Sequence, residues 1–361
     1  MRIVQLNPFH FPYMGGIEHR THEISKRLGS KHEVIVLTSR LPGTAEEEIM
    51  DGYRVVRLPS RFITNYNPPY VVTPGVLEAL GSLEADLVDF HYRWAPSYSR
   101  AMKKYRGRWM FTFHNTYGEG DGAARPLSHM NDALFCRMIR DRRTVCVSEF
   151  VRDDLLNRGF RRDLTDVVSL GVDIYDGPTS EEDFILFTGR LVATKGVRYL
   201  IEAMRTVDSK LVIMGKGPEE KRLRSLAEQS GVGGRVVFTG HVSEEEKVRL
   251  MSSCKIFAMP SLFESFGLAT AEVMAYGKPV VASKVGGLPE VVGDGGILVA
   301  PASPRDIAAA LDRLLRDDGL RHDLGRRARK HIGRFNWDSI AAQTERIYLE
   351  EVEKYGAEMP R

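Results

Sequence analysis

Two glutamates in the stretch "PSLFESFGLATAEVMAYGKPVVAS", residues 260–283, have a spacing that suits ligand binding. Glu264 and Glu272 are separated by seven residues, and Gly267 lies between them. Carboxylates accept hydrogen bonds from hydroxyl groups, while the free backbone amides at a helix start donate to anions. A segment with both groups could therefore bind a ligand that carries hydroxyls and a phosphate.

Each glutamate also has a simpler explanation. A negative charge at a helix start interacts favourably with the helix dipole, which would account for Glu264. Glu272 lies further inside, beside Ala271, Val273 and Met274, where an unpaired buried carboxylate is costly. Either a lysine or arginine elsewhere in the chain or a ligand hydroxyl must therefore partner Glu272. Both interpretations stay open at this point.

A strand, a loop, a helix and a second strand are expected to position the two glutamates. The residues after Gly267 favour helix, Gly277 suits a helix end and Pro279 prevents continuation, so the pattern predicts a helix over 267–276. The apolar runs "CKIFAMPS" and "KPVVAS" on either side predict strands. In such a unit the loop lies at the carboxyl edge of the sheet, where open α/β sheets bind ligands. We expect the amides of residues 266–268 to face a ligand there.

A second segment, "FTGRLVATKGVRYLIEA", offers positive charge at the same edge. Arg190 follows a predicted strand, and Lys195 comes just before a predicted helix. Arginine can bind two phosphate oxygens in a bidentate manner, and lysine adds a second positive charge, so the two residues suit a diphosphate. A solvated basic loop is the competing interpretation.

The first half of the chain has its own candidates at strand ends. Gly15 and Gly16 stand between the first strand and a helix, where a phosphate could approach the backbone, although a tight turn is the more common explanation of a glycine pair. His91 and His114 follow consecutive buried strands, and Asn115 comes next. A single histidine is commonly structural, but two at neighbouring strand ends indicate a polar lining.

The whole chain alternates strand-like and helix-like segments in two successive series. This alternation predicts an α/β fold with two doubly wound parallel sheets, which would face each other across a cleft. The segment "VSLGVDIYDGPTSEED" is rich in glycine, proline, serine and acids, so we place a hinge near residues 171–180.

Composition limits the remaining function classes. The net charge of +3 gives no argument for a nucleic-acid partner. The three cysteines lack the spacing of a disulfide framework or a zinc site. No apolar run has the length of a membrane span, and the first residues enter a strand directly, so a cytoplasmic location is the expectation.

These motifs together resemble one family. The order of the glycine pair, the histidine, GR(x)4KG, E(x)7E with FGL inside, and "GGLPEVV" at 286–292 is similar to that of the family-four retaining glycosyltransferases of the GT-B fold. The resemblance covers nearly the whole chain, from Gly15 to the C-terminal "FNWDSIAAQTERIY". It implies an acceptor-side Rossmann-like domain over 1–172, a donor-side Rossmann-like domain over 173–335, and a helix over 336–361 that crosses back to the first domain.

The resemblance also implies a role for each candidate. Glu272 would bind the ribose of a nucleotide sugar, and Glu264 would bind hydroxyls of the donor sugar. The diphosphate would contact both Arg190 and Lys195, which would stabilise the leaving group. The other implied contacts are Ser265, Phe266, Gly267 and Leu268 to the donor, Gly15 and Gly16 to the phosphates, His114 to the donor sugar near the reacting centre, and His91 and Asn115 to the acceptor. Ser265 departs from the glycine that many relatives carry.

The implied reaction moves a hexosyl or N-acetylhexosaminyl group from a UDP-sugar, or from GDP-mannose as the second choice, to a hydroxyl acceptor. The acceptor would be a glycan, a lipid-linked precursor or a small molecule. The resemblance implies retention of the anomeric configuration without a metal or other cofactor, and the sequence has no DxD motif. A nonhydrolysing nucleotide-sugar epimerase and a noncatalytic two-lobed binding protein are the alternatives.

Residues 93–108, "RWAPSYSRAMKKYRGR", carry six basic residues and no acid. With the neighbouring aromatic side chains this segment could rest on an anionic membrane surface, as some relatives with lipid-linked acceptors do, which would place the protein peripherally at the inner face of the membrane. The alternative is an ordinary solvated helix face whose aromatic side chains lie in the core.

Overall fold

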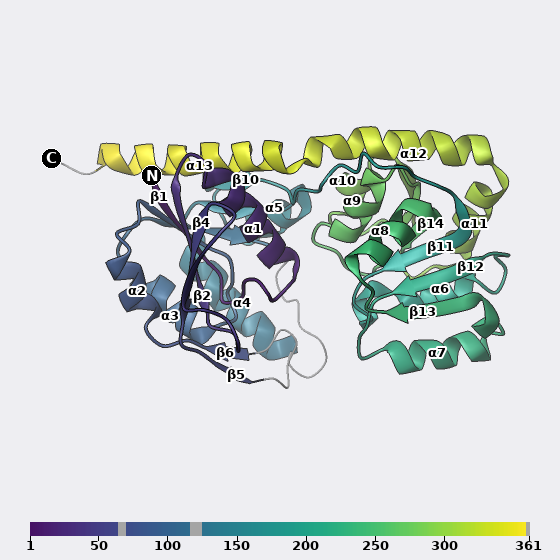
Figure 1. Cartoon of the computed structure of the whole chain (residues 1–361), viewed down its shortest axis with the longest axis horizontal. Coiled ribbons are helices and arrows are strands. Elements are labelled where there is room, and N and C mark those ends of the chain that lie inside the picture. Colours follow the sequence, from purple (N-terminus) through teal and green to yellow (C-terminus); the bar gives the residue numbers. More distant parts are fainter. Residues whose placement is uncertain (64–69, 116–124, 359–361) are drawn as a thin grey trace. The chain divides into compact units, whose positions relative to one another are not determined.

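The computed structural model describes residues 1–63, 70–115 and 125–358 (Figure 1). Two compact units account for the chain. Unit 1 comprises Met1–Gly171 and the chain from Trp337 onward, and unit 2 comprises Val172–Asn336. Each unit is a largely parallel sheet with helices packed on it, which confirms the predicted α/β fold class.

The sheet of unit 1 has eight strands in the order β10-β9-β8-β7-β1-β2-β4-β3. Its strands are β1 (Arg2–Leu6), β2 (Glu33–Ser39), β3 (Glu47–Met50), β4 (Tyr53–Leu58), β7 (Leu87–Phe90), β8 (Trp109–Phe113), β9 (Thr144–Cys146) and β10 (Thr165–Val167). Neighbouring strands are parallel except β3, which pairs with β4 in antiparallel fashion. The central strands are almost continuously apolar and buried because helices cover both faces.

Several helices belong to unit 1, together with a small hairpin. The helices are α1 (Gly16–Leu28), α2 (Val76–Ser82), α3 (Pro96–Lys104), α4 (Arg125–Ile139), α5 (Glu149–Leu156) and α13 (Trp337–Glu358), and the hairpin pairs β5 (Arg61–Ile63) with β6 (Tyr70–Val72). The sequence did not predict β3, β5, β6 or β10. These strands are short, and β3, β5 and β6 alternate exposed with less exposed residues, so they lack the apolar run on which the prediction depended.

The sheet of unit 2 is entirely parallel, in the order β13-β12-β11-β14-β15-β16. Its strands are β11 (Glu182–Thr188), β12 (Lys210–Met214), β13 (Val236–Gly240), β14 (Cys254–Met259), β15 (Val280–Ser283) and β16 (Gly296–Val299). Its helices are α6 (Val197–Ala203), α7 (Glu220–Gln229), α8 (Glu244–Ser253), α9 (Leu268–Ala275), α10 (Leu288–Val292), α11 (Pro304–Arg316) and α12 (Asp318–Ile332). The helix expected over 267–276 is α9, shorter by one residue at each end.

Both sheets reverse their strand order at one point. The reversal lies between β11 and β14 in unit 2 and between β1 and β7 in unit 1. At such a switch point the loops that follow the two central strands diverge to opposite faces, and ligands of open α/β sheets bind there. In each unit, ligand-binding residues are therefore expected in the two loops at the switch point.

The last long helix, α13, packs on α1 and completes the core of unit 1. Trp337 and Tyr348 are buried in the same cluster as Ile3 and Ile24. A side chain at Gly171 would lie 2.3 Å from the Trp337 ring, so the glycine allows the helix to dock. Residues from 337 onward are therefore part of unit 1 rather than a separate body.

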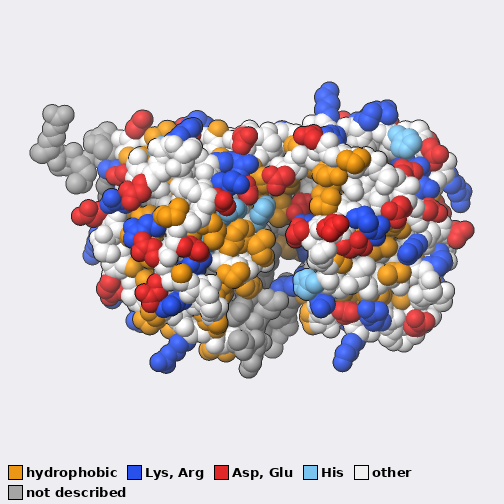
Figure 2. Space-filling model, viewed as in Figure 1, with side chains coloured by type: hydrophobic (Ala, Val, Ile, Leu, Met, Phe, Trp, Pro, Cys, Tyr) orange, Lys and Arg blue, Asp and Glu red, His pale blue; other side chains and the backbone are white. Residues whose placement is uncertain are grey.

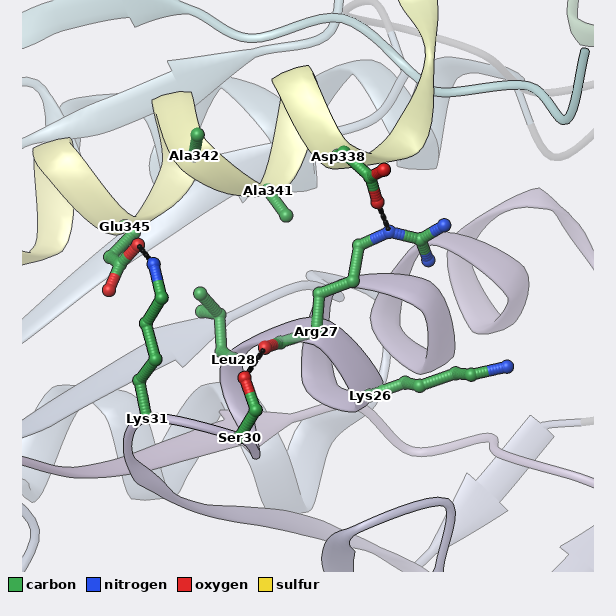
Figure 3. Close-up of a pocket in the computed structure, with 9 residues that line it drawn as sticks. All are labelled: Lys26, Arg27, Leu28, Ser30, Lys31, Asp338, Ala341, Ala342 and Glu345. Atoms are coloured by element: carbon green, nitrogen blue, oxygen red, sulfur yellow. Dashed lines mark hydrogen bonds and ion pairs between the residues drawn. The ribbon is translucent and has the colours of Figure 1, made fainter.

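Ion pairs line the outer side of the junction between α1 and α13 (Figure 3). Arg27 donates to Asp338 at 2.7 Å, and Lys31 donates to Glu345 at 2.8 Å. These pairs are partly solvated, and pairs of that kind contribute little stability. The buried apolar face of α13 is therefore the main attachment.

The face drawn in Figure 2 shows no large field of one sign among the described residues. On the face drawn in Figure 2, acidic and basic side chains are interspersed on both units. This distribution agrees with the small net charge of +3. Among the described residues, no helix combines the length and the apolar character needed to cross a membrane.

The docking of α13 predicts a large effect of Trp337→Ala. Truncation of this side chain, which is 2% exposed, should lower the free energy of unfolding by about 3–5 kcal/mol because it leaves a cavity in the core of unit 1. Leu349→Ala on the same helix is the control, since Leu349 is 39% exposed and its loss should cost less than about 1 kcal/mol. Urea unfolding of both variants measures the difference, and similar losses would contradict the docking described above.

Candidate functional site

The switch point of unit 2 brings three of the predicted residues to one edge of the sheet. Strands β11 and β14 are parallel neighbours, so the loops that follow them begin side by side. The first loop carries Arg190 and Lys195, and the second carries Glu264. Residues far apart in the sequence thus converge because of strand order alone.

Close backbone contact holds these two loops together. The amide of Leu262 donates to the carbonyl oxygen of Thr194 at 2.8 Å. Gly196 has φ +64°, and a Cβ there would lie 2.1 Å from the carbonyl oxygen of Pro260. A side chain at position 196 is therefore excluded both by space and by backbone conformation.

A third loop, which follows β15, supports the backbone of Glu264. The amide of Gly287 donates to the carbonyl oxygen of Glu264 at 3.0 Å. Gly286 has φ +55°, and a Cβ there would lie 1.8 Å from the same oxygen. The glycine pair of "GGLPEVV" therefore has a structural purpose, which is to let this loop lie directly against the Glu264 backbone.

Lys195 and Glu264 form an ion pair across the switch point. The lysine Nζ lies 2.5 Å from a carboxylate oxygen, and the two side chains are 23% and 14% exposed. Each group keeps hydrogen-bonding capacity beyond this contact, because an ammonium has three donors and a carboxylate can accept several bonds. The pair can therefore offer a cation to an anionic group and a carboxylate to a hydroxyl at adjacent positions.

Glu272 also has a basic partner. Lys247 from α8 donates to its carboxylate at 3.2 Å, and the Glu272 side chain is 28% exposed. Burial alone would lower the pKa of Lys247, but Glu272 and Glu244 raise it above its ordinary value. Lys247 is thus the basic residue that the sequence could not identify, and Glu272 remains accessible enough to accept further hydrogen bonds.

The start of α9 presents free amides beside Glu264. Gly267 precedes the helix in a left-handed conformation, with φ +103°. Within the described part of the chain, the amides of Phe266, Gly267 and Leu268 meet no hydrogen-bond acceptor. Phe266 is buried and packs edge-on against Phe335, with ring centroids 5.5 Å apart, which anchors this turn.

Arg190 and Ser265, which were also predicted, lie on the same two loops. Arg190 is exposed on the loop after β11, and Ser265 is half-buried beside Glu264. Unit 2 thus combines cations, carboxylates and free amides along one sheet edge.

In unit 1 the predicted glycine pair lies at the start of α1, next to a carboxylate that the sequence analysis missed. Gly15 precedes the helix, and a Cβ on it would lie 2.4 Å from a carboxylate oxygen of Glu18. Glu18 is 4% exposed, and burial raises its pKa to about 7. The sequence did contain a signal for this residue, because Glu18 is an acid in the first helical turn after the two glycines. The carboxylate already occupies space beside Gly15, where a phosphate was expected.

The two predicted histidines of unit 1 are in direct contact. His91 Nδ1 and His114 Nε2 lie 3.0 Å apart at the ends of the neighbouring strands β7 and β8. Burial lowers the pKa of His91 to about 4 and that of His114 well below its ordinary value. Both rings are therefore neutral at physiological pH. Asn115 follows His114 and is half-buried.

Further polar residues behind the histidines were not singled out from the sequence. Gln5, Asp89, Thr112 and Tyr348 are all fully buried and hydrogen-bonded to one another or to His91. A polar residue inside an otherwise apolar strand, such as Gln5 in "RIVQL", was a usable signal. Tyr348 on the distant α13 offered none.

The basic segment 93–108 divides into buried and exposed parts. Arg93 is buried and pairs with Asp132 at 2.8 Å, and Tyr98, Met102 and Trp109 are buried in the core. The exposed cations are Arg100, Lys103, Lys104 and Arg106. Three of the apolar side chains that would have entered a membrane thus lie inside the protein, while Trp94 is half-buried, packs against Arg93 and donates to Asp132.

Among the described residues, no group of three or more His, Cys, Asp or Glu side chains has an arrangement that could hold a metal ion. The polar groups of the unit 2 edge are instead a mixture of cations, carboxylates and amides, which suits an organic anion with hydroxyls.

Two family models match successive parts of the chain. Residues 14–175 match the model described as Glycosyltransferase Family 4, and residues 176–331 match the model described as Glycosyl transferases group 1. The boundary between the two matches falls within a few residues of the boundary between units 1 and 2.

Individual proteins give the same result. An uncharacterized glycosyltransferase of Methanocaldococcus jannaschii is 40% identical over 187 residues, which are 50% of this chain and 48% of the relative. A phosphatidyl-myo-inositol mannosyltransferase of Mycolicibacterium smegmatis is 28% identical over 375 residues, 96% of this chain and 93% of the relative. Among solved structures, HepE of Anabaena in complex with UDP-glucose has a TM-score of 0.80 and 21% identity, with 97% of this chain and 100% of that chain covered.

The contact at Gly286 predicts a severe effect of Gly286→Ala. The added methyl group would collide with the Glu264 carbonyl, so the variant should lose about 3 kcal/mol or more of unfolding free energy, and the loop should move. Gly231→Ala is the matched control, because Gly231 has φ +70° but nothing within 4 Å of the added atom, and it should lose only about 1 kcal/mol. Denaturant unfolding compares the two, and equal losses would show that the two loops do not depend on this contact.

The buried Glu18 predicts a specific pH dependence. Its pKa is about 7 in the folded protein against 4.5 as the ordinary value, so the folded state binds its proton more tightly than the unfolded state. Stability from this group is therefore full below pH 4.5 and declines as the pH rises to 7, by about 3 kcal/mol. Glu18→Gln should become increasingly more stable than wild type over that window. Thermal unfolding across pH measures the difference, and parallel profiles would contradict the burial of a titrating Glu18.

Proposed function

The chain belongs to the glycosyltransferases of family 4 and group 1, and on that premise we propose that it moves a hexosyl or N-acetylhexosaminyl group from a nucleoside-diphosphate sugar to a hydroxyl acceptor with retention of configuration. The observation that supports the donor class is the Lys195–Glu264 pair at the unit 2 switch point, beside the free amides of α9. This edge offers cations for a diphosphate and carboxylates for hydroxyls.

Each group has a role in this proposal. Lys195, Arg190 and the α9 amides hold the diphosphate, and Glu264 accepts from hydroxyls of the donor sugar. Glu272, which pairs with Lys247, accepts from the ribose hydroxyls. His114 of unit 1 accepts a hydrogen bond from a sugar hydroxyl. The assignments follow from the donor and acceptor capacities of these side chains.

A UDP-sugar is the proposed donor, with GDP-mannose as the alternative. HepE of Anabaena, which shares the fold, has been solved with UDP-glucose. The similarity to a phosphatidyl-myo-inositol mannosyltransferase supports GDP-mannose as the alternative donor. The acceptor is proposed only as a hydroxyl of a glycan, a lipid-linked precursor or a small molecule.

The proposed reaction does not depend on a metal ion. The bond between the anomeric carbon and the diphosphate oxygen breaks, and a bond from the acceptor oxygen to the anomeric carbon forms on the same face. The acceptor proton passes to the departing phosphate oxygen, so no protein nucleophile is required. The positive side chains and amides stabilise the negative charge that develops on the leaving group.

Two other functions give different experimental results. A nonhydrolysing epimerase would isomerise the donor sugar in the absence of any acceptor. A noncatalytic binding protein would be stabilised by a nucleotide sugar without turning it over. Product analysis after incubation with nucleotide sugars separates both from a transferase.

Lys195→Met is expected to abolish most turnover. With water as the acceptor, slow release of UDP or GDP from a nucleotide sugar gives an assay that needs no acceptor. Loss of the lysine should lower the rate by about 10²–10³-fold because it removes positive charge from the leaving diphosphate. Arg198→Ala provides the matched control, since this arginine lies on α6 with a side chain that is 50% exposed and paired with Glu202.

Two results would contradict the role of Lys195. One is a Lys195→Met variant that is folded, by thermal unfolding, and as active as wild type. The other is an equal loss of activity in Arg198→Ala, which would mean that any change near α6 lowers the rate.

Membrane contact through residues 93–108 has its own test. Because Tyr98, Met102 and Trp109 are buried and Trp94 is half-buried, attachment would depend mainly on the exposed cations. We therefore propose a solvated helix face and expect no flotation with phosphatidylserine vesicles at physiological salt, where such contacts are weakened by screening. Flotation that persists at this salt and is lost when Lys103 and Lys104 become glutamine would establish the membrane interpretation instead.

A further inference from the structure

A chain of buried hydrogen bonds runs through unit 1 from Asp89 to His114. It links the strands β1, β7 and β8 with the C-terminal helix α13. The side chains of Gln5, His91 and Tyr348 are its intermediate members, and each is at most 2% exposed. Because each member is a specific donor or acceptor, the direction of every bond can be worked out from the chemistry of its groups.

The direction is set at the Asp89 end. The Tyr348 hydroxyl lies 2.6 Å from a carboxylate oxygen of Asp89 and donates its single proton there. The hydroxyl oxygen must then accept from Gln5, whose Nε2 lies 2.9 Å away. This contact fixes the orientation of the Gln5 amide, so its carbonyl oxygen faces the other way.

The next bond fixes the proton on His91. The Gln5 carbonyl oxygen lies 2.5 Å from His91 Nε2 and can only accept, so Nε2 carries the hydrogen. Burial lowers the pKa of His91 to about 4, so the ring is neutral and its Nδ1 has no hydrogen. His91 Nδ1 is therefore an acceptor for the neighbouring ring.

The last hydrogen bond determines which ring nitrogen of His114 carries the hydrogen. Its Nε2 lies 3.0 Å from His91 Nδ1 and must donate to it. The ring is neutral because burial lowers its pKa, and the positive charges of Arg20 and Arg93 lower the pKa further. A neutral imidazole with its hydrogen on Nε2 has a bare Nδ1, and that atom meets no hydrogen-bond donor among the described residues.

We propose that Tyr348 is a positioning residue which, through Gln5 and His91, fixes the tautomer of His114 and leaves Nδ1 free to accept a hydrogen bond from a substrate hydroxyl. The inference rests on the proposed function for the identity of that hydroxyl, but the tautomer of His114 depends only on the hydrogen bonds within this protein. In the opposite tautomer, Nδ1 would donate instead of accept, and the contact with His91 would be lost. The C-terminal helix thus contributes to the chemistry at the sheet edge of unit 1.

The surrounding structure supports this role for α13. Trp337 and Ile347 anchor the helix in the core of unit 1, which holds the Tyr348 hydroxyl in place. Thr112 also donates to the Asp89 carboxylate, at 2.8 and 3.0 Å, but among the described residues it forms no side-chain hydrogen bond with Gln5 or either histidine. Thr112 is therefore as buried as Tyr348 but is not part of the series of hydrogen bonds that leads to His114.

Nitrogen-15 NMR of the full-length protein tests the proposal, because protonated and bare imidazole nitrogens have separate resonances. The His114 signals are assigned by their loss in His114→Gln. Wild type should show a hydrogen on Nε2 alone. Tyr348→Phe keeps the ring but removes the hydroxyl, so Gln5 can rotate and His114 should become a mixture of tautomers. Gln5→Met breaks the same chain at a second point and should give the same mixture.

Thr112→Val is the matched control. It removes a buried hydrogen bond to the same carboxylate and should lower stability, but the tautomer of His114 should not change. The proposal is overturned if wild type carries the hydrogen on Nδ1, or if folded Tyr348→Phe and Gln5→Met keep the single wild-type tautomer. It is also overturned if Thr112→Val gives the same mixture, since the effect would then be general loosening.

Activity separates this inference from the proposed function. If the protein releases UDP or GDP from a nucleotide sugar, Tyr348→Phe should lower kcat/KM by about tenfold, the effect of about one hydrogen bond. A tautomer change in Tyr348→Phe without any change in kcat/KM would refute the link to the substrate hydroxyl. Absence of any nucleotide-sugar reaction in wild type would refute the proposed function and leave the NMR result for the tautomer intact.

Discussion

The close approach of backbone to backbone at the carboxyl edge of the unit 2 sheet is the constraint on which the candidate site depends. Gly196 lets the loop after β11 contact the loop after β14, and Gly286 and Gly287 let the loop after β15 contact the same segment. These contacts place Lys195 within 2.5 Å of Glu264. Pairing two long side chains costs side-chain entropy in any case. Rigid loops avoid the additional cost of ordering the backbone when the ion pair forms.

Both sheets have a switch point, but the chemistry at the two switch points differs. Unit 2 gathers charge at its switch point, with the Lys195–Glu264 pair beside the free amides of α9. In unit 1 the corresponding edge is lined with neutral histidines behind which Asp89 and Tyr348 are buried. A charged edge suits an anionic ligand, while a neutral edge with a defined tautomer suits a hydroxyl. Both properties are needed by a protein that acts on a nucleotide sugar.

The sequence predicted those features that depend on local pattern. The α/β class, the helix near 267–276 and the strand-end location of His91 and His114 follow from apolar periodicity and from glycine and proline positions. The partners of these residues could not be predicted. Lys247 lies on another helix from Glu272, and Tyr348 is separated from His91 by most of the chain, so only the folded topology brings them together. Short strands such as β10 and β16 were missed because their few residues have no distinct pattern.

Hydrogen exchange with mass spectrometry would show whether the loops at the unit 2 switch point bind the proposed nucleotide-sugar donor. The full-length protein is compared with and without UDP-glucose, UDP-N-acetylglucosamine and GDP-mannose. We expect one of these donors to slow exchange at residues 189–196, 262–268 and 284–287, because the ligand would cover the free amides and restrict the motion of the loops around them. Protection confined to other parts of unit 2, or no protection by any nucleotide sugar, would contradict this expectation.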